Sequence, residues 1–305
     1  PVDKIGYSDD YFGDVLHYLP PGSPSYYSVA EFNMKVLLLI FSILAALIFL
    51  GWLGLKIKPA PFSPYPEKTP ELKTIPLPGG LPAPVERFYK TVYGGEIPVI
   101  ESAVLQGRAV IAPFGVKLPA RFVFVHEAGK GYRHYIEATW FGMPIMKVNE
   151  RYVDGQSLFE LPVGEPIVND PSTNQGANLA VWAEAGWFPS IWITDSRVRW
   201  EPVDEKTALM YVPFEGQEEN FVMRFNPETG LLDSMEAMRY RDSGPQAKKI
   251  LWITRNVPGK KIEGTQLDAI GSATWLDQGI PWATFTLEEV NYNVDVSEYI
   301  RQKGP

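Results

Sequence analysis

The feature that most constrains this chain is an uninterrupted apolar stretch near its N-terminus, VLLLIFSILAALIFLGWLGL, at residues 36–55. No charged residue occurs in it, and as a helix it would span about 30 Å, the thickness of the hydrocarbon core of a bilayer. A buried helix of this length in a globular domain normally carries a polar stripe, which is missing here. Trp52 lies near one end, where interfacial aromatic residues gather. The stretch therefore predicts a transmembrane helix, which we assign to residues 34–56.

A cleaved signal peptide is the alternative interpretation. Signal peptides begin with a basic region, contain a shorter apolar run and end at a site of small residues. Here 35 residues precede the apolar stretch, and the KIKPAPFSP segment after it is a poor cleavage site. We therefore interpret the helix as a permanent, single-pass anchor in the cell (inner) membrane.

The distribution of basic residues predicts the orientation of this anchor. Within about 20 residues of the apolar stretch 36–55, the range that matters for the positive-inside rule, Lys35 is the only basic residue before it. Four lysines follow it: Lys56, Lys58, Lys68 and Lys73. The rule predicts that residues 1–33 form an acidic tail outside the cytoplasm and that the large domain is cytoplasmic. A periplasmic or other extracytoplasmic domain is the alternative.

Composition excludes several classes of function. The net charge is −8 and no cluster of lysine and arginine is interleaved with aromatic residues, so we expect no nucleic-acid partner. The chain has no cysteine, which excludes disulfides, thiolate catalysis and cysteine-ligated metal centres. No nucleophile elbow, phosphate-binding loop or dinucleotide fingerprint occurs. We therefore expect no enzymatic activity and no cofactor.

The rest of the chain predicts a proline-rich linker followed by one β-rich domain. Residues 57–84 are rich in proline, which favours an extended, semi-rigid spacer or a strap along a partner. Residues 85–300 begin with a short predicted helix, PVERFYKTVYG, and continue with alternating, turn-bounded segments typical of strands. These are RFVFVHE, YRHYIEATW, MPIMKVNERYV, TALMYVPF, NFVMRFN, LLDSMEAMRYR, KKILWITRNV and PWATFTLEEVNYN.

One segment interrupts the strands, NDPSTNQGANLAVWAEAGWFP, and it predicts a helix of about four turns. Asp170 or Ser172 would cap its start, and Pro189 would end it soon after Gly186. The fold class is thus mainly β, within α+β. After one N-terminal transmembrane helix we expect a curved antiparallel sheet or half-barrel covered by one or two helices.

Four segments, in order, resemble an uncharacterised bacterial family of single-pass membrane proteins with a domain of unknown function. They are LPAPVERFYKTVYG, EAGWFP, VRWEPVDEKTALM and FNPETGLLDSMEAMRYRD, and the resemblance covers roughly residues 81–291. The Trp-Phe-Pro motif and the later Arg-Tyr-Arg are its most specific pieces, and neither is a catalytic signature. The family domain is similar to the lipoprotein-carrier (LolA-like) fold, which implies a curved antiparallel sheet closed by helices around an apolar hollow, and a hydrophobic ligand within it.

Two histidines flank a predicted hairpin, HEAGKGYRH. Facing strands would allow His126 and His134 to gather with Glu127 and Glu137 as metal ligands. Strand alternation can equally place these side chains on opposite faces, and a polar hairpin tip is the simpler interpretation. We therefore predict no metal site.

The candidate ligand-binding residues centre on the tryptophan-rich stretch EAGWFPSIWITDSRVRW, residues 184–200. A corner that seals the core is the simpler interpretation, and an aromatic wall for an apolar ligand or a docking surface for another subunit are the functional ones. A solvent-facing helix position is likewise the simpler interpretation of Glu184. If buried, it needs a partner, which an arginine of the sheet would supply, or a raised pKa. It would then be either a structural ion pair or a functional acid. The set comprises Trp182, Glu184, Trp187, Phe188, Trp200, Arg224, Arg239 and Arg241.

Two functions remain open at this point. The first is a membrane-anchored, non-enzymatic module that binds a hydrophobic or lipid-like ligand, with membrane lipids as its partners. The second is an accessory subunit of a larger integral membrane complex, docked through the N-terminal tail, the transmembrane helix and the proline-rich linker. A carrier requires an apolar cavity, whereas a subunit can have a filled core and requires its tail and linker to be buried.

Overall fold

The computed structural model describes residues 24–303, with side chains described from residue 31 onward except at Phe114. The chain divides into two compact units, residues 1–54 and residues 55–305. The described part of the first unit is one helix, α1 (Pro24–Gly54). Helix α1 begins before the predicted start at residue 34. Most of the predicted tail, residues 1–23, lies outside the described residues.

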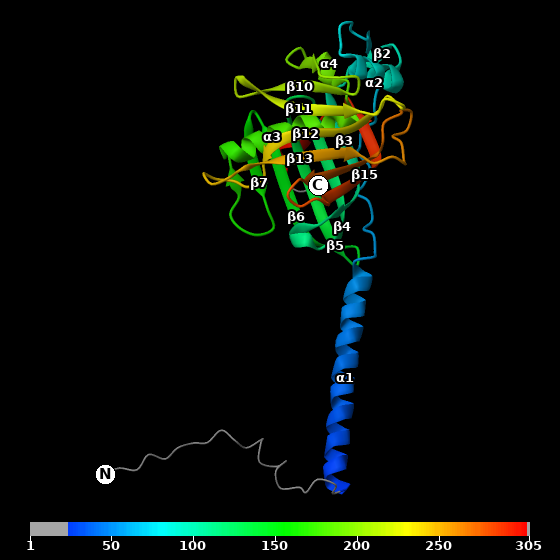
Figure 1. Ribbon diagram of the computed structural model, residues 1–305, viewed down its shortest axis with the longest axis vertical. Helices are drawn as coiled ribbons and strands as arrows, with labels where there is room; N and C mark the ends of the chain where they lie inside the picture. The colour runs from blue at the N-terminus through cyan, green and yellow to red at the C-terminus, as the bar shows by residue number, and fades with distance from the viewer. Residues whose placement is uncertain (1–23, 304–305) are drawn as a thin grey trace, which may run out of the picture. The chain divides into compact units, whose positions relative to one another are not determined.

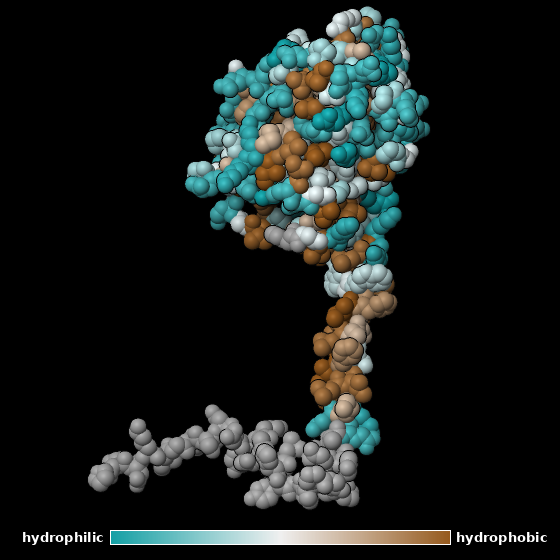
Figure 2. Space-filling model, in the orientation of Figure 1, coloured by the Kyte–Doolittle hydropathy of each residue, from teal (hydrophilic) through white to brown (hydrophobic). Residues whose placement is uncertain are grey.

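Helix α1 contains the apolar stretch found in the sequence. Residues Glu31–Gly54 are long and apolar enough to cross a membrane, and none of the most apolar window is buried against the protein. Figure 2 shows apolar side chains along the visible face of this helix. A helix of this kind near an N-terminus is compatible with a membrane span and with a signal sequence.

The second unit is built on one antiparallel sheet (Figure 1). Its order is β8-β7-β6-β5-β4-β3-β15-β14-β13-β12-β11-β10-β9, and a separate pair is formed by β1 (Thr74–Pro76) and β2 (Glu96–Pro98). The first half contains β3 (Ser102–Ile111), β4 (Leu118–Glu127), β5 (Gly131–Trp140), β6 (Met143–Val153), β7 (Gln156–Glu160) and β8 (Ile167–Val168). The second half contains β9 (Arg199–Pro202), β10 (Thr207–Phe214), β11 (Gln217–Phe225), β12 (Leu232–Tyr240), β13 (Lys249–Asn256), β14 (Ile270–Trp275) and β15 (Pro281–Tyr292). The predicted mainly β, antiparallel fold is confirmed.

The strand order explains where the helices lie. Each half is a meander of neighbouring strands, and the halves join where β3 pairs with β15. The chain must therefore travel from β8 at one edge to β9 at the other. It does so through α3 (Pro171–Glu184), a short 3₁₀ turn and α4 (Ile191–Thr194). Helix α3 contacts strands from both halves, and Figure 1 shows the sheet curled around it.

Local sequence explains how α3 begins. Asp170 caps it, because one carboxylate oxygen accepts a hydrogen bond from the backbone N–H of Thr173 at 2.9 Å. Pro171 occupies the first turn, where its missing N–H costs nothing. Gly176 allows close approach to β12, since a Cβ there would lie 3.2 Å from the carbonyl oxygen of Tyr240. The helix and its cap, both predicted from the sequence, are confirmed.

The core has two parts on opposite faces of the sheet. The larger one lies on the inner face and includes residues of α3, α4 and α2 (Ala83–Tyr93), whose buried residues include Phe88 and Tyr89. The smaller one lies on the outer face, where Tyr65 of the proline-rich linker packs among valines of β3 and β4. The Tyr65 hydroxyl donates a 2.6 Å hydrogen bond to the carbonyl oxygen of Asp295. The linker is therefore a strap bound to its own domain.

Candidate functional site

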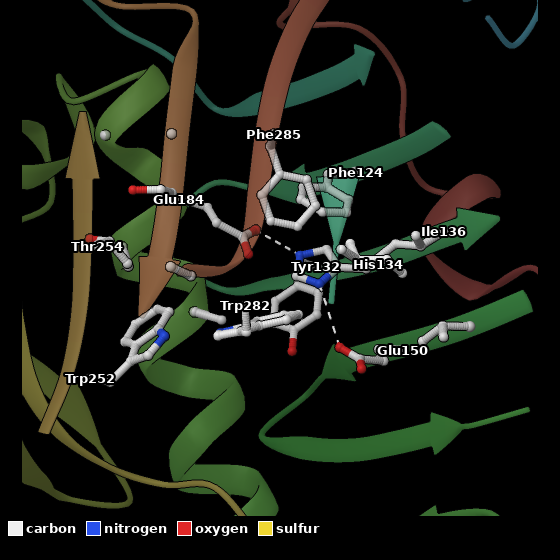
Figure 3. Close-up of a pocket in the computed structure, with 18 of the residues that line it drawn as sticks. Phe124, Tyr132, His134, Ile136, Glu150, Glu184, Trp252, Thr254, Trp282 and Phe285 are labelled. Atoms are coloured by element: carbon white, nitrogen blue, oxygen red, sulfur yellow. Dashed lines mark hydrogen bonds and ion pairs between the residues drawn. The ribbon is translucent and has the colours of Figure 1, made fainter. Parts of the chain in front are cut away.

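An apolar cavity of about 380 Å³ lies between α3 and the inner face of the sheet. Both halves of the sheet contribute to it, together with the end of α3 (Figure 3). Aliphatic and aromatic side chains dominate the lining, which includes Phe124, Ile136, Met146, Val148, Trp187, Met235, Trp252, Trp282 and Phe285. The polar residues of the lining are Tyr132, His134, Glu150, Glu184, Ser234, Arg239, Thr254, Arg255, Asn256 and Ser272. Helix α3 therefore covers the inner face of the sheet but leaves a space between itself and the strands.

Trp187 forms part of the apolar wall because α3 ends just before it. The helix stops at Glu184 and continues as the 3₁₀ turn Ala185–Trp187, which directs the indole ring toward β14. Gly271 of β14 makes room for that ring, since a Cβ at this position would lie 2.8 Å from it. The hydroxyl of Tyr292 donates a hydrogen bond to the carbonyl oxygen of Trp187 at 2.8 Å. The wall is thus fixed by a strand on one side and a backbone anchor on the other.

A cluster of one carboxylate and two imidazoles lies at the polar end of the cavity. Oε2 of Glu184 is 2.6 Å from Nε2 of His134 and 3.0 Å from Nε2 of His126. The contact with His134 is a hydrogen bond, whereas the one with His126 lacks hydrogen-bonding alignment. Nδ1 of His134 lies 3.7 Å from Oε2 of Glu150 on the neighbouring strand β6. Figure 3 shows His134 between these two carboxylates.

Burial and charge act in opposite directions on the three groups. Burial would raise the pKa of Glu184, but the neighbouring imidazoles outweigh it and lower the pKa to about 2. Burial would lower the pKa of His134, but Glu184 and Glu150 outweigh it, and the pKa is raised. For His126 burial prevails, and its pKa is lowered. The neighbouring charges thus favour the ionised form of Glu184 and the protonated form of His134, whereas burial favours the neutral form of His126.

Arg239 lies elsewhere in the lining. Its guanidinium carbon is 4.5 Å from the ring centre of Trp252 and 5.5 Å from that of Trp275. Its Nε donates a 2.9 Å hydrogen bond to the carbonyl oxygen of Gly176 in α3. Burial lowers the pKa of this guanidinium. Arg239 thus ties α3 to β12 and adds a cation to the cavity wall.

The candidate residues chosen from the sequence fall into three groups. Glu184, Trp187 and Arg239 line the cavity. Trp182, Phe188 and Trp200 do not line it: Trp182 and Phe188 are buried in the core, and the Trp200 indole donates a 3.1 Å hydrogen bond to the carbonyl oxygen of Trp192. Arg224 and Arg241 form ion pairs away from the cavity, with Glu236 and Asp277 respectively.

Glu184 also has different partners from those expected. Neither the solvent-facing position nor an arginine partner is found, because the end of α3 lies over β4 and β5, which carry the two histidines. Its side chain is 18% exposed and faces the cavity.

The pairing of β4 with β5 determines which of the predicted metal-ligand candidates at the hairpin lie on the same face of the sheet. His126 pairs with Tyr132 and Phe124 pairs with His134, so both histidines face inward. Glu137 lies on the outer face, where it binds Arg121 at 2.6 Å. Glu127 forms an ion pair with Lys130 at the hairpin. The histidines therefore meet Glu184 of the helix, and neither Glu127 nor Glu137 joins them.

Sequence reasoning missed most of the aromatic lining. Phe124, Trp252, Trp282 and Phe285 come from three different strands. Alternation marks Phe124 and Phe285 as inward positions, since Phe122 and Phe124, or Phe285 and Leu287, are two residues apart. Trp282 lies at a register shift of β15 and does not follow this alternation. Alternation predicts which residues face inward, but it does not show where the inward residues leave a space.

The fold and the site define a class of protein: a curved antiparallel sheet wrapped around a helix, with an apolar cavity enclosed between them. The chain belongs to DUF6544, a family of unknown function whose match covers residues 72–287. The resemblance drawn from the sequence to an uncharacterised family is thereby confirmed.

Solved structures with a similar fold have low sequence identity to this chain. A LolA superfamily protein from Nitrosomonas europaea is 13% identical with a TM-score of 0.43, and the match covers 73% of this chain and 99% of that one. A DUF1329 family protein from Desulfovibrio piger is 13% identical with a TM-score of 0.41, covering 67% and 90%. No curated protein matches the sequence.

Proposed function

We propose that this protein is a membrane-anchored, non-enzymatic module that binds a hydrophobic or lipid-like ligand between α3 and the sheet. The single observation that carries the proposal is the cavity of about 380 Å³. Pockets that enclose small ligands typically measure about 300–1,000 Å³ and are mostly apolar with a few placed polar groups. This cavity has that size and that lining.

The aromatic wall supports an apolar occupant. Trp187, Trp252 and Phe285 come from elements far apart in the sequence and surround the same space. An apolar ligand that covers such side chains gains about 25 cal/mol per Å² of surface removed from water. The indole N–H groups of Trp252 and Trp282 are buried without a hydrogen-bond partner among the described residues, so a ligand oxygen would find donors here.

The alternative function, an accessory subunit of a membrane complex, fits the described part of the molecule less well. A docking role for the linker requires it to be available, yet Tyr65 is 4% exposed and is packed on the linker's own domain. Lys68, farther along, is 2.6 Å from Glu289 of β15. The strap thus has an intramolecular role, and the core beneath α3 is not filled.

Membrane attachment and orientation are the remaining parts of the proposal. Helix α1 would anchor the chain in the membrane, because its apolar side chains from Val36 onward are largely exposed. The excess of lysine after the helix favours a cytoplasmic domain. The ligand would then be taken from, or kept near, the cytoplasmic leaflet.

A pair of matched substitutions on β13 tests the cavity. Thr254 faces the cavity, and its neighbour Ile253 points to the other face of the sheet. Native mass spectrometry of the full-length protein, extracted in mild detergent, should show a discrete bound mass in the wild type and in Ile253→Phe. The same mass should be lost in Thr254→Phe, because the added ring fills the space. Trp187→Ala should also lose it, because part of the wall is removed.

Two results would overturn the proposal. One is a wild-type protein with no bound mass that also shows no saturable binding of a fluorescent long-chain alkyl probe. The other is a bound mass that persists in Thr254→Phe. Migration in a stoichiometric large complex, without a bound ligand, would favour the accessory-subunit function instead.

A further inference from the structure

The polar end of the cavity has a second property, independent of any apolar ligand. Three potential metal-binding atoms, one each from His126, His134 and Glu184, lie within 4.8 Å of one another. They come from β4, β5 and α3, three elements fixed by the core. Among the described residues, no other group of three or more histidine or acidic side chains meets this geometry.

His126 gives the strongest indication that something is bound here. It is fully buried, and neither of its ring nitrogens has a hydrogen-bond partner among the described residues. A buried polar atom left without a partner costs about 1–3 kcal/mol, so buried imidazoles normally have one. Its Nε2 nevertheless lies 3.0 Å from Oε2 of Glu184 without hydrogen-bonding alignment. An ion bound by both Nε2 of His126 and Oε2 of Glu184 would give this nitrogen the partner that it lacks.

The surroundings of His134 are those of a metal-binding imidazole. Its Nε2 faces Glu184, and its Nδ1 faces Glu150 at 3.7 Å. Histidines that bind metals usually direct their second nitrogen to a carboxylate or carbonyl, which fixes the ring and the tautomer. The Tyr132 ring stacks on the imidazole at 3.8 Å with an angle of 15°, which also holds the ring in place.

The charge of the cluster matches a divalent cation. Glu184 and Glu150 supply two carboxylates, and among the described side chains no lysine or arginine forms an ion pair with either. Imidazoles bind metals in the neutral form, so a metal ion would face two negative charges. Arg239 instead donates a hydrogen bond to the carbonyl oxygen of Gly176 and lies over the ring of Trp252.

We propose that His126, His134 and Glu184 bind a divalent transition-metal ion, zinc being the best fit, with one coordination position open to the cavity. Two imidazoles and one carboxylate are a known ligand set for zinc. Zinc keeps such ligands at about 2.0–2.2 Å, so tetrahedral ligand atoms are about 3.4 Å apart and Glu184 would retreat slightly from both nitrogens. His134 and Glu184 line the cavity and His126 does not, so the free position faces the cavity. This differs from the sequence-based prediction of no metal and does not depend on a lipid-like ligand.

The composition of the chain allows a sharp test. It has three histidines and no cysteine, so His17 in the tail is the natural control. Full-length protein in detergent would be stripped with a chelator and titrated with Zn²⁺ by calorimetry, and separately with Co²⁺ while the visible absorption is recorded. We expect one ion per chain and the visible bands of tetrahedral Co²⁺. The protein as purified from cells should contain the same metal by elemental analysis.

Variants assign the site. Affinity should fall about 100-fold or more in His126→Gln, His134→Gln and Glu184→Gln, and about 10- to 100-fold in Glu150→Gln, which removes only the orienting carboxylate. His17→Gln should bind like the wild type. Far-ultraviolet circular dichroism of each stripped variant checks that it is folded, and the Co²⁺ spectrum of the wild type tests the ligand set even if a variant fails to fold.

Two outcomes would overturn the proposal. A stripped wild-type protein that takes up no stoichiometric Zn²⁺ or Co²⁺ would show that the cluster is an ion-paired network without a metal. Binding that is lost in His17→Gln and kept in the three site variants would place the metal outside the cavity.

Discussion

Helices α1 and α3 contrast with each other, because neither is a conventional amphipathic helix and the reasons are opposite. From Val36 to Trp52, α1 presents apolar side chains on all sides, and its most apolar window has no buried residue. Helix α3 is buried on all sides from Thr173 to Ala183, although three of those residues are Asn174, Gln175 and Asn178. An apolar helix that is exposed on all sides is typical of a membrane span and of a signal sequence.

The surroundings of α3 show what complete burial requires of polar residues. Oδ1 of Asn174 accepts hydrogen bonds from the backbone N–H of Ser157 at 2.9 Å and from its hydroxyl at 2.7 Å. The side-chain amide of Gln175 donates to the carbonyl oxygen of Met238, and that of Asn178 donates to the carbonyl oxygen of Pro213. These bonds attach α3 to strands of both halves. The polar side chains thus fix the position of the helix over the cavity.

The largest effect is expected from placing charges in α1. Leu44→Arg combined with Leu47→Arg would cost roughly 5–7 kcal/mol for membrane insertion, at about 2.5–3.5 kcal/mol for each arginine near the centre of a span. Flotation of membranes on a density gradient should find the variant outside the membrane fraction, whereas Leu44→Ala with Leu47→Ala remains in it. The thermal unfolding of the domain should be the same in both. Flotation of the arginine variant with the membranes would contradict a spanning α1.

A smaller effect is expected from an apolar substitution in α3. Asn174→Leu leaves the buried N–H of Ser157 without its acceptor, so the free energy of unfolding should fall by about 1–3 kcal/mol. Urea denaturation monitored by tryptophan fluorescence would measure the change. Exposed Met238→Leu is the control and should alter the free energy of unfolding by less than about 0.5 kcal/mol. Equal stability of Asn174→Leu and the wild type would mean that apolar packing alone holds α3.

The smallest effect concerns the cap of α3, and it depends on pH. Burial would raise the pKa of Asp170, but the hydrogen bonds from Thr173 and Gly244 outweigh it, so the pKa is lowered. A carboxylate with a lowered pKa stabilises the fold above its unfolded-state pKa of about 3.9 and loses that contribution as the pH falls through its folded-state pKa. Asp170→Ala should therefore cost about 1 kcal/mol at neutral pH.

Urea denaturation at neutral and acidic pH would measure this dependence. The difference between the wild type and Asp170→Ala should begin to narrow as the pH falls below the unfolded-state pKa of about 3.9, and it should be lost below the lowered folded-state pKa of Asp170. Asp170→Asn keeps a capping oxygen and should lose only part of the stability at neutral pH. A difference that does not change with pH would show that the charge of Asp170 is irrelevant to the cap.

Much of the fold could be predicted from the sequence because its patterns are local. The apolar stretch, the alternating strands and the capped helix depend on neighbouring residues alone. Strand β3 was not singled out, because it lacks alternation: its inner face joins the main core and its outer face is covered by the strap, so Val104 and Leu105 are both buried. Covering both faces of a strand removes the polar positions that would have revealed it.

The site could be predicted only in part, because it depends on register and on distant contacts. The two histidines share a face because Glu127 pairs with Gly131 across the hairpin, and a loop one residue longer or shorter would have separated them. Glu184 is 50 residues away from His134, and no local pattern connects them. Glu184, Trp187 and Arg239 line the cavity, but no arginine forms an ion pair with Glu184 among the described residues, and Arg239 instead binds Gly176 of α3 and lies over tryptophan rings.

The position of β3 beside β15 has a consequence for how the protein is made. A ribosome produces β3 well before β15, yet these two strands form the seam at the middle of the sheet. The seam cannot close until β15 has been synthesised, and contacts this distant in sequence form slowly. Until then one edge of β3 has no partner, and unpaired edges recruit strands from other chains. During this interval the free edge of β3 can pair with a strand of another chain, so separation of nascent chains favours correct folding.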